Sequence, residues 1–207
     1  MKRLLISAFT AFTLFSYSQT EYEIILFDAN VDPFDIIGSQ EYETYNRVGN
    51  DITEKLAPEA IVKDKAEAIG NDTFDAKNLL DGNMQTCWLT SWDGKNEVFE
   101  IVIDIEENPN VNSAQLISFY FANGNRKNLE SWMNYSRIKK MSMSINEKPY
   151  AEITLEDTYK TQSIDMDKFK IEKSKRYRFR FRILEIYKGK KFDQLALSDV
   201  QITGKIK

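Results

Sequence analysis

The sequence predicts an all-β protein, folded as an antiparallel β-sandwich or barrel. Three observations support this fold class. Apolar and polar residues alternate in several short segments, as they do in half-buried strands whose successive side chains point to opposite faces. Turn-forming residues separate these segments. No strong helical pattern is present, and the best helical candidate, residues 51–70 with its recurring alanines, is interrupted by Pro58.

The expected strands follow one another along most of the chain. The clearest is residues 176–183, where Tyr177 and every second residue after it share one face and four arginines share the other. In residues 115–121, we expect Ile117, Phe119 and Phe121 on one face. The other expected strands are residues 22–27, 98–105, 138–145 and 195–203. Turns are expected at residues 81–83, 93–96, 108–110, 123–125 and 188–190. Many short strands joined by such turns are typical of antiparallel sandwiches and barrels.

The first residues have the pattern of a secretory signal peptide. Lys2 and Arg3 precede an apolar run at residues 4–15, which is shorter than the roughly 20 residues that span a bilayer. Small residues at 16 and 18 form a cleavage site before Gln19. No cysteine lies near this site and no second long apolar run follows. We therefore expect a secreted, periplasmic or cell-surface protein with neither a lipid anchor nor a membrane span.

The expected domain organisation has three parts. Residues 1–18 are the signal peptide, and residues 61–207 form the β-sandwich. Residues 19–60 are either an N-terminal extension or the first part of the same domain. The mature chain has a length that suits one domain of this kind.

The residues that are missing exclude most kinds of catalytic site. The sequence has no histidine and a single cysteine, Cys87, so a Cys–His pair, a Ser–His–Asp triad and a His-ligated zinc site are all excluded. The commonest general acid–base near neutral pH is also absent. Cys87 lies between Thr86 and Trp88, and we expect both Cys87 and Trp88 in the core. The sequence therefore predicts a protein that is not an enzyme.

The charge of the chain argues against nucleic acid as a partner. The full sequence has 28 basic and 32 acidic residues, a net charge of −4. Loss of Lys2 and Arg3 with the signal peptide leaves 26 basic residues (28 − 2) and a net charge of −6 (26 − 32). General binding of DNA or RNA needs a positive field, because the phosphate backbone dominates the affinity.

Four motifs carry a resemblance to a known family. Residues 76–88 read AKNLLDGNMQTCW and resemble the opening of discoidin-like, galactose-binding-like domains. The later motifs lie at residues 123–127 followed by 134–139, at 155–157 and at 186–200. In this order they resemble a narrower branch, the glycan-binding module named after the translocation domain of a bacterial NAD-glycohydrolase toxin. The toxin's catalytic domain has no counterpart here.

The resemblance runs from Ala76 to Gly204 and implies a jelly-roll β-sandwich that binds a carbohydrate. Two positions depart from the branch. Residues 94–97 lack the second glycine of its Gly-x-Gly-Glu turn, and Asp199 stands where the branch has glutamate. Both changes keep the chemistry of the position and leave the identity of the glycan open.

The resemblance also implies a structural calcium ion. In discoidin-like modules, the Asp-Gly turn and an acid near the C-terminus often converge on such an ion. The expected ligands are Asp81, Asn83, Thr86 and Asp199. Calcium takes about six to eight oxygen ligands, which a tight turn can supply together. The alternative is that Asp81 only caps the turn through a bond from side chain to backbone.

Aromatic residues in or near turns are the candidates for binding a glycan. Trp and Tyr cover the apolar face of a sugar ring, and nearby amide, carboxylate and guanidinium groups bind its hydroxyls. The expected ligand-binding residues are Trp92, Asp93, Asn96, Trp132, Asn134, Arg137 and Tyr187. The alternative for Trp92 and Trp132 is ordinary packing at the ends of the sandwich.

The arginines at 176, 178, 180 and 182 have two interpretations. They could hold an anionic glycan through charge-assisted forks. The commoner role of such a stripe is cross-strand pairing with acids such as Glu100 or Asp104.

The sequence as a whole predicts an exported, non-catalytic carbohydrate-binding module. A protein-interaction or adhesion module on the same fold is the alternative, since a fold does not determine function. A glycosidase that uses paired carboxylates, such as Asp93 and Asp193, is the third and least favoured class.

Overall fold

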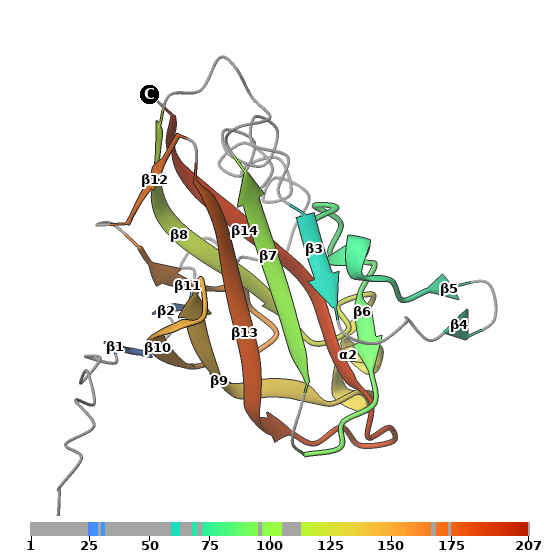
Figure 1. Cartoon of the computed structure of the whole chain (residues 1–207). Coiled ribbons are helices and arrows are strands. Elements are labelled where there is room, and N and C mark those ends of the chain that lie inside the picture. Colours follow the sequence, from blue (N-terminus) through green and yellow to red (C-terminus); the bar gives the residue numbers. More distant parts are fainter. Residues whose placement is uncertain are drawn as a thin grey trace, which may run out of the picture.

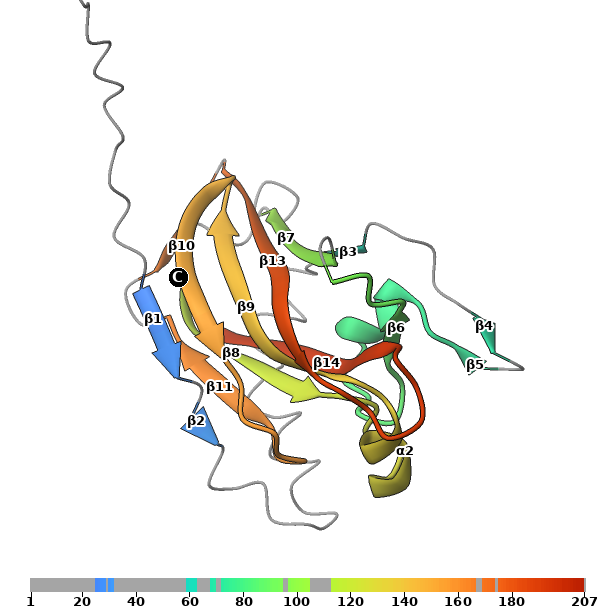
Figure 2. The same ribbon diagram turned by 90° about the horizontal axis from the view of Figure 1, so that it is seen from below.

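A computed structural model describes residues 25–28, 30–31, 59–62, 68–69, 72–94, 97–104, 113–166, 169–173 and 175–206. Two sheets of six strands face each other (Figures 1 and 2). The elements are β1 (Ile25–Asp28), β2 (Asn30–Val31), β3 (Glu59–Val62), β4 (Ala68–Ile69), β5 (Asp72–Thr73), the 3-10 helix η1 (Ala76–Leu79), β6 (Trp88–Thr90), β7 (Val98–Asp104), β8 (Ser113–Asn123), α2 (Leu129–Asn134), β9 (Arg137–Ile145), β10 (Lys148–Thr154), β11 (Gln162–Asp165), β12 (Lys170–Glu172), β13 (Arg176–Tyr187) and β14 (Leu195–Ile206). Within the described residues, no helix combines the length and apolar character needed to cross a membrane.

Each sheet has a simple order. Sheet I runs β1-β10-β9-β13-β7-β3, and sheet II runs β2-β11-β8-β14-β6, with β12 pairing the other end of β8. Neighbouring strands in both sheets are antiparallel, except that β1 pairs with β10 in parallel. The short strands β4 and β5 form a separate pair. The predicted all-β antiparallel sandwich is confirmed.

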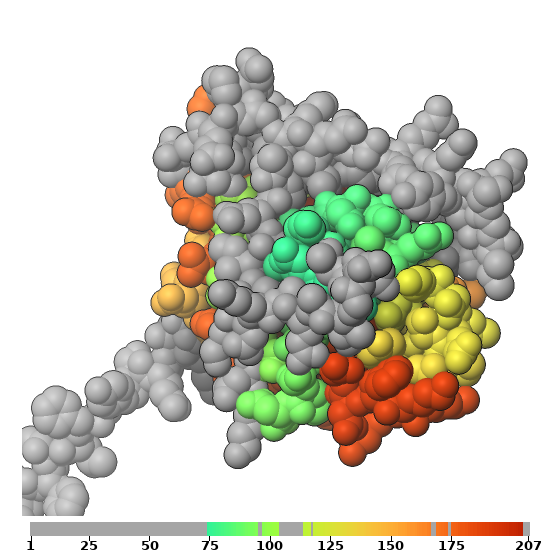
Figure 3. Space-filling view, turned by 90° about the vertical axis from the view of Figure 1, so that its right-hand side faces the viewer, coloured from blue at the N-terminus to red at the C-terminus, as the bar shows by residue number. Residues whose placement is uncertain are grey.

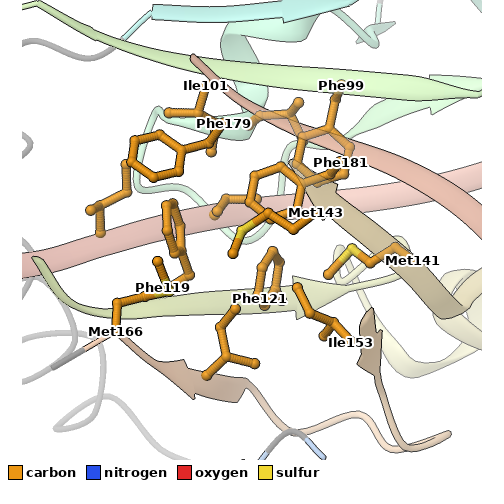
Figure 4. Close-up of a cluster of buried hydrophobic side chains, with 14 of the residues drawn as sticks. Phe99, Ile101, Phe119, Phe121, Met141, Met143, Ile153, Met166, Phe179 and Phe181 are labelled. Atoms are coloured by element: carbon orange, nitrogen blue, oxygen red, sulfur yellow. The ribbon is translucent and has the colours of Figure 1, made fainter. Parts of the chain in front are cut away.

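Phenylalanine side chains fill the space between the two sheets (Figure 4). Phe99 and Phe181 stack at 4.7 Å between ring centroids, and Phe119 meets Phe179 edge-on at 5.3 Å. All four rings are fully buried. Aromatic pairs in these arrangements contribute about 0.5–1.5 kcal/mol each beyond the area that they bury. This packing fixes the position of sheet I relative to sheet II.

Strand β13 shows how the predicted alternation produces this core. Tyr177, Phe179, Phe181 and Ile183 point inward and are buried, while the arginines between them are exposed. On β8, Phe119 and Phe121 are buried as expected, and Leu116 is buried as well. The pairing of β8 with β14 shifts its register between Ser118 and Leu116, and such a shift moves the inward face by one residue. The side chain of Ile117 lies outside the described residues.

The expectation of a helix in residues 51–70 is wrong for the part that the structure describes. Residues 59–62 form β3, which pairs antiparallel with β7 at the edge of sheet I, and residues 68–69 form β4. A strand forms here instead of a helix because the edge of β7 has a row of backbone groups that need hydrogen-bond partners, and β3 supplies them. Residues 51–58, 63–67 and 70 lie outside the described residues.

The segment before residue 61 contributes to both sheets. β1 adds an edge strand to sheet I beside β10, and β2 pairs with β11 in sheet II. The expected signal peptide, residues 1–18, lies outside the described residues.

Cys87 and Trp88 are both buried, as expected. Trp88 belongs to the core between the sheets, whereas Cys87 packs with Phe74, Leu89 and Ala196 in a second, smaller cluster. The single cysteine is therefore a packing residue.

Four connections meet at one end of the sandwich, which we call the loop end. The register places Arg137 opposite Tyr187, Val98 opposite Arg182 and Leu195 opposite Thr90. Consequently the β6–β7, β8–β9, β10–β11 and β13–β14 connections emerge on the same side. Figure 3 shows two of them in contact, the segment around residue 130 beside that around residue 190.

Candidate functional site

Arg137, at the start of β9, holds several parts of the loop end together. Its guanidinium makes two hydrogen bonds to Asp157, at 2.8 and 3.1 Å, and its remaining nitrogen donates to the carbonyls of Trp132 and Tyr135, at 3.2 and 2.9 Å. Only 7% of its side chain is exposed. A guanidinium fork that binds a carboxylate with two bonds is a strong and directional contact. Arg137 therefore fixes the β10–β11 connection against α2.

Trp132 lies directly against this arginine. The guanidinium carbon of Arg137 is 4.4 Å from the centre of the indole ring, and the ring of Tyr159 meets it edge-on at 5.8 Å. The indole nitrogen donates to the carbonyl of Asn123 at 3.0 Å. On the next side, Arg126 lies 4.7 Å over the ring of Tyr159. Two adjacent rings thus lie between two guanidiniums, a set that we call the aromatic–arginine stack.

Three polar side chains near the stack each make two hydrogen bonds to backbone groups, one as donor and one as acceptor. Asn123 donates to the carbonyl of Ile138 at 2.7 Å and accepts from its amide at 3.0 Å, so it joins β8 of sheet II to β9 of sheet I. Ser198 donates to the carbonyl of Gly124 and accepts from the amide of Arg126, both at 2.9 Å. Gln162 makes the same double contact with Glu156. Buried polar groups that are paired in this way make a rigid framework.

An aromatic pair lies on the surface of this framework, with Phe192 exposed and Tyr135 partly buried. Phe192, in the β13–β14 connection, is 41% exposed and packs on Tyr135, with ring centroids 4.7 Å apart. We call these two residues the platform. Sequence analysis missed Phe192, although it lies within the motif at 186–200 and precedes the exposed Asp193. Its apolar character in a polar turn was the available signal.

The platform is held in place by backbone contacts with α2. The amides of Lys190, Lys191 and Phe192 donate to the carbonyls of Met133 and Asn134, at 2.9–3.2 Å. Gly189 lies so close to this helix that a Cβ atom there would be 2.3 Å from the carbonyl oxygen of Asn134. An aromatic residue on a rigid connection loses little conformational entropy when a ligand binds it.

The described members of the predicted ligand-binding set lie at the loop end with different degrees of exposure. Trp132 and Asn134 belong to α2, and Tyr187 donates from its hydroxyl to the carbonyl of Leu155 at 3.1 Å. Trp92 is half-buried against the main core, while Asp93 beside it is exposed. Asn96 lies outside the described residues. Ligand contact by these residues and by Arg137 stays a prediction.

The Asp-Gly turn is closed by its own side chains. Asp81 accepts from the amide of Asn83 at 2.8 Å and from the hydroxyl of Thr86 at 2.7 Å, and Asn83 accepts from the amide of Gln85 at 3.0 Å. Gly82 has the left-handed conformation that this turn requires, with φ at +68°. These contacts give Asp81 the turn-capping role.

The predicted calcium ligands are not a cluster of acids. Asp81 is exposed, whereas Asp199 is fully buried in β14 opposite Ala122. Among the described residues, no group of three or more histidine, cysteine, aspartate or glutamate side chains is arranged to hold a metal ion. Calcium binding by Asp81, Asn83, Thr86 and Asp199 stays a prediction. The side-chain oxygens of the first three already take part in hydrogen bonds of the turn.

The sequence matches the family described as NAD glycohydrolase translocation F5/8 type C domain over residues 55–203, more than half of the chain. The chain belongs to this family. The resemblance seen in residues 76–204 is thereby confirmed, and the match extends it toward the N-terminus to include β3. Among curated proteins, none matches this chain.

Solved structures share the fold of this family member. One is a protein from Bacteroides thetaiotaomicron described as a chitobiase fragment, which is 21% identical; the alignment covers 72% of this chain and 90% of that chain, with a TM-score of 0.50. Another is the family 32 carbohydrate-binding module of EndoD from Streptococcus pneumoniae, which is 11% identical; the alignment covers 72% of this chain and 99% of that chain, with a TM-score of 0.50. These likenesses confirm the galactose-binding-like jelly-roll sandwich.

Proposed function

We propose that this chain is an exported, non-catalytic glycan-binding module that binds its ligand at the loop end. The observation that carries the proposal is the platform, where Phe192 is 41% exposed and stacked on Tyr135. Sugar rings present flat faces of C–H groups, and an exposed ring on a rigid support binds such a face.

Polar groups around the platform suit the hydroxyls of a sugar. Asp193 follows Phe192 and is exposed, and Lys191 lies 3.6 Å from Glu130 of α2. Trp92, Asp93, Asn134 and Tyr187 lie in the connections or at the strand ends of the same end. They are proposed as further contacts, together with Asn96, which lies outside the described residues. The fold shared with a carbohydrate-binding module supports this class of ligand.

The absence of catalysis is proposed from composition. The chain has no histidine and its single cysteine is buried. Export is proposed from Lys2, Arg3 and the apolar run at 4–15.

A glycan array with the protein displayed as a multimer tests the proposal, because single modules bind weakly and multivalency raises the apparent affinity. We expect Phe192→Ala to abolish the signal of the glycan that the wild type binds. Phe192→Tyr should restore it, since the ring is kept. The matched control is Leu129→Ala, which truncates another apolar side chain of the loop end that is 55% exposed but has no ring.

Two results would oppose this function. Binding that Phe192→Ala leaves unchanged would remove the platform from the site. A wild-type protein that binds no glycan would favour the second candidate, a protein-interaction or adhesion module. The exposed apolar side chains of Leu129 and Phe192 support that second candidate, because apolar groups at a surface also serve protein contacts.

A further inference from the structure

Sheet I carries a row of arginines on its outward face, distinct from the platform. Arg176, Arg178, Arg180 and Arg182 are the outward residues of β13, which lies between β9 and β7 in the sheet nearest the viewer in Figure 1. Residues two apart in a strand are about 6.7 Å apart, so this arginine row is about 20 Å long. The buried side chains between the arginines fix the backbone that presents them.

One acid on the neighbouring strand β7 forms ion pairs with two of the four arginines. The carboxylate of Glu100 on β7 lies 3.3 Å from Arg178 and 3.2 Å from Arg180. The side chain of Glu100 is only 14% exposed, whereas those of the two arginines are 45% and 44% exposed. Glu100 therefore lies beneath the guanidiniums, which keep an outward edge. The sequence-based expectation of pairing with Glu100 is confirmed for these two arginines.

Among the side chains that the structure describes, no acid pairs with either end of the row. Within the described part of the chain, neither Arg176 nor Arg182 forms an ion pair, and both are exposed. Asp104 is the cross-strand neighbour of Arg176, and Val98 is that of Arg182. The row therefore has more positive than negative charge.

The strands beside the row add little competing charge. On β9, the neighbours of Arg180 and Arg182 are Ser144 and Ser142, which are small and uncharged. Two other acids of the sheet are already paired with lysines, since Glu152 lies 2.6 Å from Lys140 and Glu185 lies 2.7 Å from Lys139. The hydrogen bond between Lys139 and Glu185 raises the pKa of the lysine and lowers the pKa of the glutamate. Both groups thus stay charged and neutralise each other near pH 7.

We propose that the arginine row binds a linear anionic polysaccharide, one that bears carboxylate or sulfate groups. A guanidinium matches these planar or multidentate oxyanions with two parallel hydrogen bonds. A polysaccharide chain can follow one strand and meet several arginines in turn. Nucleic acid is a poorer fit, because its dense phosphates need a broad positive field and this chain has a net charge of −4. The row lies on a different surface from the platform and takes a charged ligand, so the inference goes beyond the proposed function.

Binding to dextran sulfate and to polygalacturonate at physiological salt tests this proposal, with uncharged dextran as the polymer control. The decisive variant is R176Q/R182Q, which removes the two arginines that make no ion pair with a described side chain. We expect its affinity for the charged polymer to fall about tenfold or more, since a hydrogen bond to a charged group is worth at least that factor. Its melting temperature should stay within a few degrees of wild type, because exposed side chains without partners contribute little to stability.

The matched control is K188Q/K190Q, which removes the same charge from the exposed β13–β14 connection and should leave the affinity unchanged. Phe192→Ala should also keep polyanion binding, which separates this proposal from the platform. Three results would overturn the inference: no binding of either charged polymer, an equal loss in K188Q/K190Q, or a DNA oligonucleotide that binds as tightly as the polysaccharides.

Discussion

Gly124 and Gly94 share a backbone conformation but not an environment. Their φ angles are +84° and +83°. A Cβ atom at Gly94 would meet nothing within 4 Å, whereas at Gly124 it would lie 2.6 Å from Cδ1 of Trp132 and 2.8 Å from Cγ of Arg137. The substitutions Gly94→Ala and Gly124→Ala therefore differ in one respect, the contact with the aromatic–arginine stack.

The magnitudes follow from these two effects. An L-residue in the left-handed region costs roughly 1–2 kcal/mol, and this applies to both positions. Overlap with a packed side chain adds roughly 1–3 kcal/mol at Gly124 alone. We expect Gly94→Ala to lower the free energy of unfolding by about 1 kcal/mol and Gly124→Ala by about 3 kcal/mol. In a chain of this size, each kcal/mol lowers the melting temperature by about 2–4 °C.

Urea unfolding followed by circular dichroism measures both free energies. Tryptophan fluorescence, compared with that of wild type, reports a change around the three indoles, of which that of Trp132 would contact the added methyl group. The fluorescence should change in Gly124→Ala, because its added methyl group displaces this ring, and stay as in wild type in Gly94→Ala. Equal losses of stability in the two variants would refute the tight packing of the stack against the end of β8.

Two further predictions concern the loop end and the Asp-Gly turn. Arg137→Ala should lower the free energy of unfolding by about 3 kcal/mol, because it removes a largely buried guanidinium and leaves Asp157 and two carbonyls without their donor; Arg182→Ala, on an exposed arginine without an ion pair, should change it by less than about 0.5 kcal/mol. If Asp81 and its neighbours bind calcium, a 100-fold excess over the dissociation constant should raise stability by about 2.7 kcal/mol, and a melting temperature that neither calcium nor a chelator changes would rule the ion out.

Local patterns sufficed for the strands that form the core. The alternation around Phe179 and Phe181 predicted both the strand and its buried face, because side chains in a strand alternate whatever the strand pairs with. They did not suffice for residues 59–62, where a strand forms because the edge of β7 is available to pair with it. Which strand lies at an edge depends on contacts far apart in the sequence.

The candidate site also has features that the local sequence predicts and features that depend on contacts between distant segments. The sequence by itself identified Asn134, Arg137 and Tyr187 from the motifs, Trp132 as an aromatic residue near a turn, and the arginine stripe of β13. Only the tertiary structure decided which of them are buried and what they contact. It buries Arg137 because Asp157, about 20 residues later, comes within 2.8 Å, and it exposes Phe192 because the β13–β14 connection docks on α2 through backbone hydrogen bonds. Exposure depends on which segments pack together, and a linear pattern of side chains does not contain that information.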